Sequence, residues 1–299
     1  MMTRLGLAAR LIAVCVSLVS GSLSPRISFA NSDQFVSGYT VLGQTGAVTV
    51  NSTNVLSPWQ SRLGISTLLA SGSGGNRFDL LLTDPASQNQ VFDLRGGLAL
   101  GLPGRLEAAV TIPYLKVDSD QASTAGLGNL TVSAKWNVRD QADWVPGIAL
   151  SASWIDATSH ELGTSSVTTN GYLASVATQL ALVSGDWAWT MMAEVGGFWR
   201  DPGRPESSSS LEYGVAGIVP LSRTGFTEET GEIQLIAEIN GTFARRDVTG
   251  RPDDATSFAP GLRYVTRAWG ATATGTVTTY EQGAKDSSAG ALVEFHVVF

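Results

Sequence analysis

Apolar and polar residues alternate with period two over most of the chain, from about residue 60 to its end. The clearest stretch is 130–138, where Leu, Val, Ala, Trp and Val share one face and Thr, Ser, Lys and Asn share the other. The same alternation marks 233–243 and 269–280, and in the second stretch a row of threonines forms the polar face. Strict alternation over such lengths predicts β-strands with one apolar and one polar face.

Twelve segments of this kind, separated by clusters of Gly, Pro, Asp, Ser and Asn, follow one another along the chain. They lie near residues 60–71, 90–101, 105–117, 126–138, 146–157, 170–183, 187–200, 209–219, 232–245, 257–266, 269–281 and 288–299. Short connections such as 102–104 alternate with long polar ones such as 72–89, although 139–145 and 220–231 are longer than this rule requires. Short turns at one end and long loops at the other are typical of outer-membrane barrels. We therefore expect an all-β fold, a transmembrane antiparallel up-and-down β-barrel of about 12 strands.

Aromatic residues on the apolar faces stand at the ends of the segments, and small or aliphatic residues fill the middle. Those next to the short connections are Trp136, Trp187, Trp189, Tyr264, Trp269 and Phe299. Those at the opposite ends are Phe92, Tyr114, Trp154, Tyr172, Trp199, Tyr213 and Phe258. Two aromatic belts around an apolar band suit the two interfaces of a bilayer, whereas a soluble β-sandwich places bulky rings at the centre of its core. The distribution favours a barrel over a sandwich.

Composition narrows the class of protein further. Charged residues make up 15% of the chain, and the formal net charge is −7 with a pI near 4.9. This balance disfavours an extended basic surface, so no nucleic-acid partner is expected. After residue 25 no apolar run is long enough for a membrane-spanning helix.

The first 30 residues are typical of a secretory signal peptide. Arg4 and Arg10 precede a short apolar stretch, residues 11–23, and the small residues Ser28 and Ala30 suit cleavage after Ala30. Cleavage would remove Cys15, the only cysteine, so neither a disulfide nor a thiolate metal site is expected, and the sequence implies no metal and no other cofactor. The predicted parts are thus a signal peptide (1–30), a periplasmic or plug-like segment (31–57) and a barrel (58–299) in the outer membrane of a Gram-negative bacterium.

If the apolar faces meet lipid, the polar faces line the lumen. The charged candidates on these faces are Arg62, Asp93, Arg95, Glu107, Lys135, Glu194, Glu212, Glu238, Arg263, Glu294 and His296. A charge facing the hydrocarbon midplane would cost about 2 to 4 kcal/mol, which favours this strand phase. Closure of the barrel should bring Arg62 close to Glu294 or His296.

The end of the chain has a pattern of its own. Ala291, Val293, Phe295, Val297 and Phe299 share one face, and the chain stops on the last of them. This ending resembles the C-terminal assembly signal of bacterial outer-membrane barrels, which implies the barrel-assembly machinery as a partner, in addition to outer-membrane lipid.

The stretch Gly126-Leu127-Gly128-Asn129-Leu130-Thr131-Val132-Ser133-Ala134-Lys135-Trp136 resembles the central signature of an outer-membrane family named for the meta-pathway of phenol degradation. The segment before the first strand, around Leu56-Ser57-Pro58, resembles the corresponding part of that family. The family tends to carry Asp where this chain has Asn129, and often Pro-Thr-Gly where this chain has Asp156-Ala157-Thr158. Its members are usually described as transporters, so the resemblance implies a transporter of small, hydrophobic or aromatic molecules.

Three functions therefore stay open. The leading one is a channel or transporter for a small-molecule solute and not an enzyme. A lipid-modifying enzyme would require His160 or His296 to meet a serine and an Asp or Asn near the membrane rim, and neither histidine has such partners at a recognisable spacing. A non-transporting structural or surface-interaction barrel would be favoured if residues 31–57 folded inward and occluded the lumen.

Overall fold

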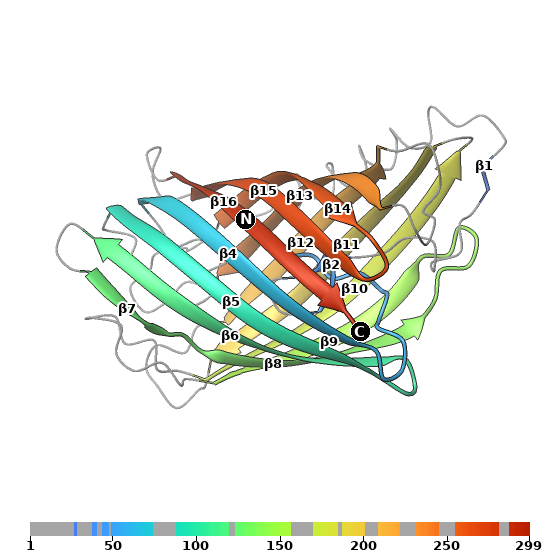
Figure 1. Cartoon of the computed structure of the whole chain (residues 1–299), viewed down its shortest axis with the longest axis horizontal. Helices are drawn as coiled ribbons and strands as arrows, with labels where there is room; N and C mark the ends of the chain where they lie inside the picture. The colour runs from blue at the N-terminus through green and yellow to red at the C-terminus, as the bar shows by residue number, and fades with distance from the viewer. Residues whose placement is uncertain are drawn as a thin grey trace.

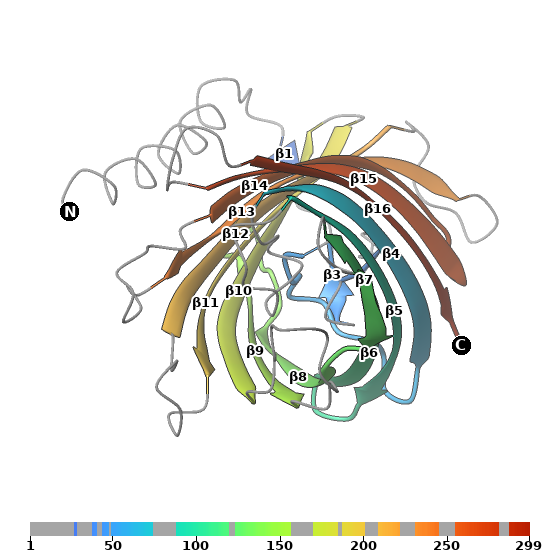
Figure 2. The same cartoon turned by 90° about the vertical axis from the view of Figure 1, so that its left-hand side faces the viewer.

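The structure, a computed structural model, describes most of the barrel and part of the chain before it. The described residues are 27–28, 38–40, 44–47, 49–73, 88–119, 123–156, 170–184, 187–200, 209–221, 231–244, 255–280 and 287–299. Within these ranges no helix is both long and apolar enough to cross a membrane. The strands form an antiparallel sheet that curls into a closed ring (Figures 1 and 2).

The ring contains twelve strands when β7 and β8 are counted as one interrupted strand. Their bounds are β4 (Ser61–Ser73), β5 (Gln88–Leu102), β6 (Leu106–Ser119), β7 (Ser123–Leu127), β8 (Leu130–Arg139), β9 (Gly147–Asp156), β10 (Gly171–Ser184), β11 (Trp187–Arg200), β12 (Ser209–Pro220), β13 (Glu232–Ala244), β14 (Ala255–Val265), β15 (Trp269–Tyr280) and β16 (Ser287–Val298). Three two-residue strands precede them, namely β1 (Ile27–Ser28), β2 (Gly38–Tyr39) and β3 (Thr45–Gly46).

The barrel closes between its last and first strands. β16 pairs antiparallel with β4 so that His296 lies opposite Gly64 and Val298 opposite Arg62. At the end of this pairing, Ser61, the first residue of β4, and Phe299, which follows β16, exchange backbone hydrogen bonds of 3.1 and 2.8 Å. Every other wall strand pairs with its neighbours in sequence, which confirms the predicted up-and-down barrel.

The two faces of the wall differ in chemistry, because successive side chains of a strand point to opposite sides. Outward positions carry large apolar side chains that are exposed, such as Leu63, Val195 and Leu262, which are 54%, 49% and 52% exposed. Inward positions are buried and mostly polar or charged. This inverts the arrangement of a soluble protein and suits a wall surrounded by hydrocarbon.

The short connections lie at one end of the barrel, together with the start of β4 and the end of β16. These connections join β5 to β6, β10 to β11 and β14 to β15. The longer connection 140–146 is an ordered turn in which Ala142 and Val145 form a β-bridge. Gln141 in this turn donates to the Ala181 carbonyl (2.7 Å) and accepts from the Ala181 N–H (2.5 Å), so it continues the pairing of β10 beyond the start of β9.

One predicted strand is interrupted. The alternation predicts a single strand over 126–138, whereas the structure ends β7 at Leu127 and begins β8 at Leu130. At the break, the Gly128 N–H donates to the Pro113 carbonyl at 2.7 Å. A Cβ on Gly128 would lie 2.8 Å from Pro113 Cγ, so this close approach requires glycine.

The predicted signal peptide lies almost wholly outside the described residues. Its Ile27 and Ser28 form β1, which pairs with Ser184 and Val183 at the end of β10. Cleavage after Ala30 remains a prediction.

Candidate functional site

The eleven predicted lumen residues all occupy inward positions of the wall strands. Nine are buried, and Arg95 and Glu194 are partly buried. They include two ion pairs: Lys135 Nζ lies 3.6 Å from Glu107 Oε1, and Arg95 Nη2 lies 2.5 Å from Asp93 Oδ2.

The expected proximity of Arg62 to the last strand follows from the closure between β4 and β16. Arg62, Glu294 and His296 all occupy inward positions of these paired strands. The His296 ring lies 3.0 Å from Glu294, between Nδ1 and Oε1.

A segment of the chain lies inside the ring. We call residues 38–57 the plug, of which 38–40, 44–47 and 49–57 are described. Figure 2 shows β3 enclosed by the wall, and β2, with which β3 pairs, lies against β16. From β3 onward the plug follows the inner wall past β14, β13, β11, β10 and β6, and it leaves the lumen just before β4 begins.

Arg263 and Glu238 hold the first part of this path. The Arg263 guanidinium donates to the carbonyls of Gly46 (3.3 Å) and Ala47 (2.8 Å). Glu238 Oε2 accepts from the Thr49 N–H (3.1 Å) and from the Thr49 hydroxyl (2.8 Å). Asn240 Nδ2 in turn donates to Thr49 Oγ1 at 2.9 Å.

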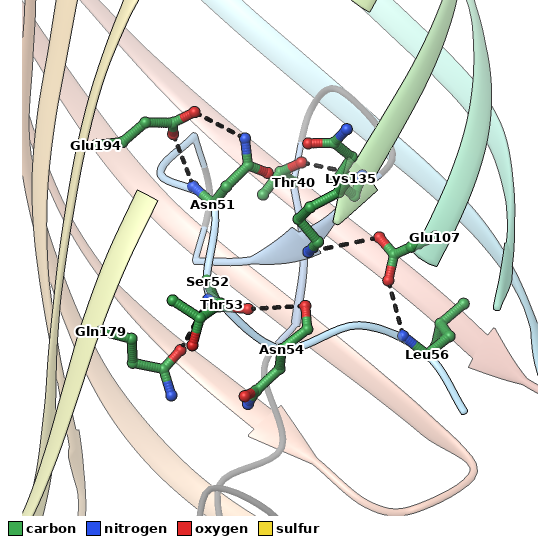
Figure 3. A network of polar contacts seen from close by, with 11 residues as sticks. Thr40, Asn51, Ser52, Thr53, Asn54, Leu56, Glu107, Lys135, Gln179 and Glu194 are labelled. Carbon is green, nitrogen blue, oxygen red and sulfur yellow. Dashed lines mark hydrogen bonds and ion pairs between the residues drawn. The ribbon is translucent and has the colours of Figure 1, made fainter. Parts of the chain in front are cut away.

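Three further wall side chains accept backbone N–H groups of the plug (Figure 3). Glu194 accepts from both the N–H and the side-chain amide of Asn51, at 2.9 Å each. Gln179 Oε1 accepts from the Thr53 N–H at 3.2 Å. Glu107 Oε2 accepts from the Leu56 N–H at 2.9 Å, while its other oxygen faces Lys135. Four backbone N–H groups of the plug are therefore satisfied by side chains of the wall and not by pairing with its strands, namely those of Thr49, Asn51, Thr53 and Leu56.

Apolar contacts complete the attachment of the plug. Ala47 and Val50 form a buried cluster with four inward apolar side chains of β11, β12 and β13, which are Met192, Ala216, Ile218 and Ile236. Leu56 forms a second cluster with Ala99 and Ala109. Inward apolar side chains are unusual in a barrel lumen, where polar residues dominate, and here they match the apolar residues of the plug.

Nearer the end of the barrel with the long connections, the inner wall has both apolar and polar parts. Ile155, Leu173 and Phe198 form an apolar cluster on β9, β10 and β11. On β15 and β16 the hydroxyls of Thr274, Thr276 and Ser288 are buried and have no hydrogen-bond partner within the described part of the chain. Buried hydroxyls of this kind are positions where water or a polar solute binds.

Of the thirteen predicted belt residues, the twelve whose side chains are described occupy outward positions. Nine are more than a third exposed, and Phe92, Trp189 and Tyr213 are partly buried. The side chain of Trp187 lies outside the described residues. Tyr264 and Trp269 approach with ring centroids 5.1 Å apart, and Phe295 continues this group at 5.9 Å from Trp269.

Sequence reasoning missed two kinds of residue. Trp59 and Trp144 lie in turns at the end of the barrel with the short connections, where they are 70% and 53% exposed. Their position in the sequence, next to the belt residues at that end, could have identified them. The plug contacts of Thr49, Asn51 and Thr53 had no such signal, because their partners lie 189, 143 and 126 residues away.

His160, the other histidine considered for an enzyme site, lies outside the described residues. In the described ranges, no group of three or more His, Cys, Asp or Glu side chains is placed to hold a metal ion.

Comparison with known proteins supports the fold. No family model and no curated protein matches the chain. The crystal structure of the COG4313 outer membrane channel from Pseudomonas putida F1 is similar, with a TM-score of 0.60, 11% identity, and coverage of 83% of this chain and 98% of that chain. The β domain of the Bordetella autotransporter Brka is similar with a TM-score of 0.51, 13% identity, and coverage of 79% and 98%. At these identities the likeness concerns the fold, that of outer-membrane barrels.

Proposed function

We propose that the protein is a bacterial outer-membrane channel or transporter for small molecules, with the plug closing the lumen in its resting state. The observation that carries this proposal is the way the plug is attached. Its backbone pairing is with itself, between β2 and β3 and between Gly46 and Asn51. Its described bonds to the wall use wall side chains, so the plug is able to leave without breaking the barrel ladder.

Conductance measurements test this proposal. The full-length protein and an Arg263→Met variant are reconstituted in planar bilayers and compared in potassium chloride. Methionine removes the donors to the Gly46 and Ala47 carbonyls, so we expect brief openings in the unmodified protein and at least about tenfold more open time in the variant. Folded barrels of both proteins that never conduct would refute the proposal.

A non-transporting structural or surface-interaction barrel is the second candidate, and the inward-folded plug is the observation that favours it. The two functions predict different results when the plug is loosened. A structural barrel would stay closed to ions and to small solutes in liposome swelling, whereas a plugged channel would admit both.

We propose that the protein is not a lipid-modifying enzyme. His296 faces the lumen, its hydrogen bond is to Glu294, and no serine hydroxyl is bonded to it among the described residues. A lumen-facing imidazole is separated by the wall from the lipid around the barrel. Release of fatty acid from phospholipid or lipopolysaccharide by the purified protein would contradict this proposal.

We further propose membership of the outer-membrane family named for the meta-pathway of phenol degradation, with small hydrophobic or aromatic solutes. The support is the signature around Gly126–Trp136, in which Gly128 makes the required close approach to Pro113.

We propose two partners as well. Outer-membrane lipid would contact the exposed apolar wall, and the barrel-assembly machinery would bind the C-terminal segment that ends in Phe299. Membrane fractionation tests the location, and a Phe299 deletion that leaves assembly unchanged would contradict the second partner.

A further inference from the structure

The plug occupies a compact site on β11, β12 and β13 that combines two carboxylates with an apolar surface. Glu194 pairs across the sheet with Gly214, and Glu238 pairs with Ala216, so the two acids stand on either side of β12. On its inward face, β12 carries only the small residues Gly214 and Ala216 between the two acids. Toward the short-turn end, the apolar cluster of Met192, Ala216, Ile218 and Ile236 continues the same surface.

The plug binds this site as a ligand with two kinds of group. Its donors are the N–H and hydroxyl of Thr49 toward Glu238, and the N–H and side-chain amide of Asn51 toward Glu194. Its apolar part is Ala47 and Val50, which are 0% and 1% exposed against the cluster. A third donor to Glu194 is the Ser175 hydroxyl of the wall itself, which stays when the plug leaves.

We propose that this site binds small amphiphilic amines, a protonated amino group bonded to a short apolar body, and that the plug is its resident intramolecular ligand. The proposal rests on the channel function proposed above and names a solute class for it. An ammonium group offers three donors and a positive charge, and charge-assisted hydrogen bonds to a carboxylate are about twice as strong as neutral ones. It replaces the N–H donors of Thr49 and Asn51, while the apolar body replaces Val50.

The two carboxylates of the site favour a cation over an anion of the same shape. Arg263 interacts electrostatically with Glu238 and Lys135 with Glu194, but the Arg263 donors are directed to the Gly46 and Ala47 carbonyls and to Thr272 Oγ1, and Lys135 is paired with Glu107. A carboxylate solute would meet Glu194 and Glu238 directly, and a neutral alcohol would form bonds without the charge. The expected order of affinity is therefore amine above alcohol above carboxylate.

Two double variants break the same hydrogen bonds from opposite sides. Thr49→Pro with Asn51→Pro removes the donors of the plug and leaves both wall carboxylates in place. Glu194→Gln with Glu238→Gln weakens the same bonds but removes the charges of the site. Both should loosen the plug and raise the potassium chloride conductance to a similar extent. Glu107→Gln is the matched control, because Glu107 also holds the plug but lies outside this site.

The probes are n-butylammonium, n-butanol and n-butanoate, measured by block of the potassium current and by calorimetry on the purified full-length variants. In the double proline variant and in Glu107→Gln, we expect n-butylammonium to bind at least about tenfold more tightly than either other probe. In the double glutamine variant this preference should disappear. Equal affinity for all three probes in the proline variant, or a preference that survives the glutamine substitutions, would overturn the inference.

The two readouts separate this inference from the channel proposal. Calorimetric binding of n-butylammonium without conductance in any variant would refute the channel and retain the site. Conductance in the loosened variants without amine preference would retain the channel and refute the site. Folding of each variant is checked by its heat-dependent mobility in gel electrophoresis.

Discussion

Replacement of Lys135 by methionine tests how the lumen stabilises its charges. Lys135 and Glu107 are both 0% exposed in their side chains, and 3.6 Å separates Nζ from Oε1. Removing one partner of a buried pair costs about 3 to 5 kcal/mol, because it leaves an uncompensated charge. Glu107 keeps the Leu56 N–H at 2.9 Å, so we expect the lower end of this range, about 3 kcal/mol.

The assay is reversible unfolding in urea from lipid vesicles, followed by tryptophan fluorescence. With a denaturant slope of about 1 to 3 kcal/mol per molar, a loss of about 3 kcal/mol lowers the midpoint by about 1 to 3 M. Lys116→Met is the matched control. Lys116 Nζ is closer to its partner, 2.7 Å from Asp118 Oδ2, but the two side chains are 47% and 41% exposed. Exposed pairs contribute about 0 to 1 kcal/mol, so the control should shift the midpoint little.

The double variant Lys135→Met with Glu107→Gln completes the test. Because it removes both charges together, it should be more stable than Lys135→Met alone. If Lys135→Met shifts the midpoint no more than Lys116→Met, the reasoning is refuted, since water in the lumen would then be screening the pair. Strictly additive effects of the two lumen substitutions would refute it as well.

Three further predictions concern the wall and the plug. Gly128→Val should destabilise the barrel by about 1 to 3 kcal/mol, because the new Cβ would lie 2.8 Å from Pro113 Cγ. Gly96→Ala is the control: a Cβ at Gly96 would have no atom within 4 Å, so the urea midpoint should stay unchanged. Val195→Arg places a charge on an exposed outward position and should cost about 2 to 4 kcal/mol in vesicles, and a cost below about 1 kcal/mol would speak against hydrocarbon at that position. Val50→Asp places a charge in the apolar cluster with Met192 and should raise the open time of single channels, so unchanged gating would show that this cluster does not hold the plug.

The alternation predicts the wall well because each strand of this barrel meets two different environments. Leu130–Arg139 shows the principle, since its outward Val132 and Trp136 are 41% and 47% exposed while inward Ser133 and Lys135 are buried. A one-residue error of phase would turn Lys135 toward lipid, so the period fixes the face of every residue. The interruption at Gly128 escapes this argument, because its cause is the contact with Pro113 on another strand.

The path of the plug could not be predicted for a related reason. Its residues have no periodicity, and the side chains that bind it were already assigned to the lumen by the phase of their own strands. Glu194 and Glu238 look the same in sequence whether they face water, an ion or a backbone N–H. Only the fold brings Asn51 and Thr49 to them, across 143 and 189 residues of chain.

The acidic residues of the lumen bind the plug without joining its backbone to the sheet of the wall. A buried irregular backbone must satisfy its N–H groups, and a strand added to the wall would do so through a ladder that opens only cooperatively. Glu107, Glu194 and Glu238 instead offer carboxylate oxygens one at a time. Each bond can be exchanged for a bond to water at a modest net cost of about 1 to 3 kcal/mol, so we expect the plug of the proposed channel to detach in steps. If the barrel is the channel proposed above, a wall whose carboxylates accept N–H donors in this way would also bind other donors that enter the lumen, and closing of the channel would then be linked to the choice of its solute.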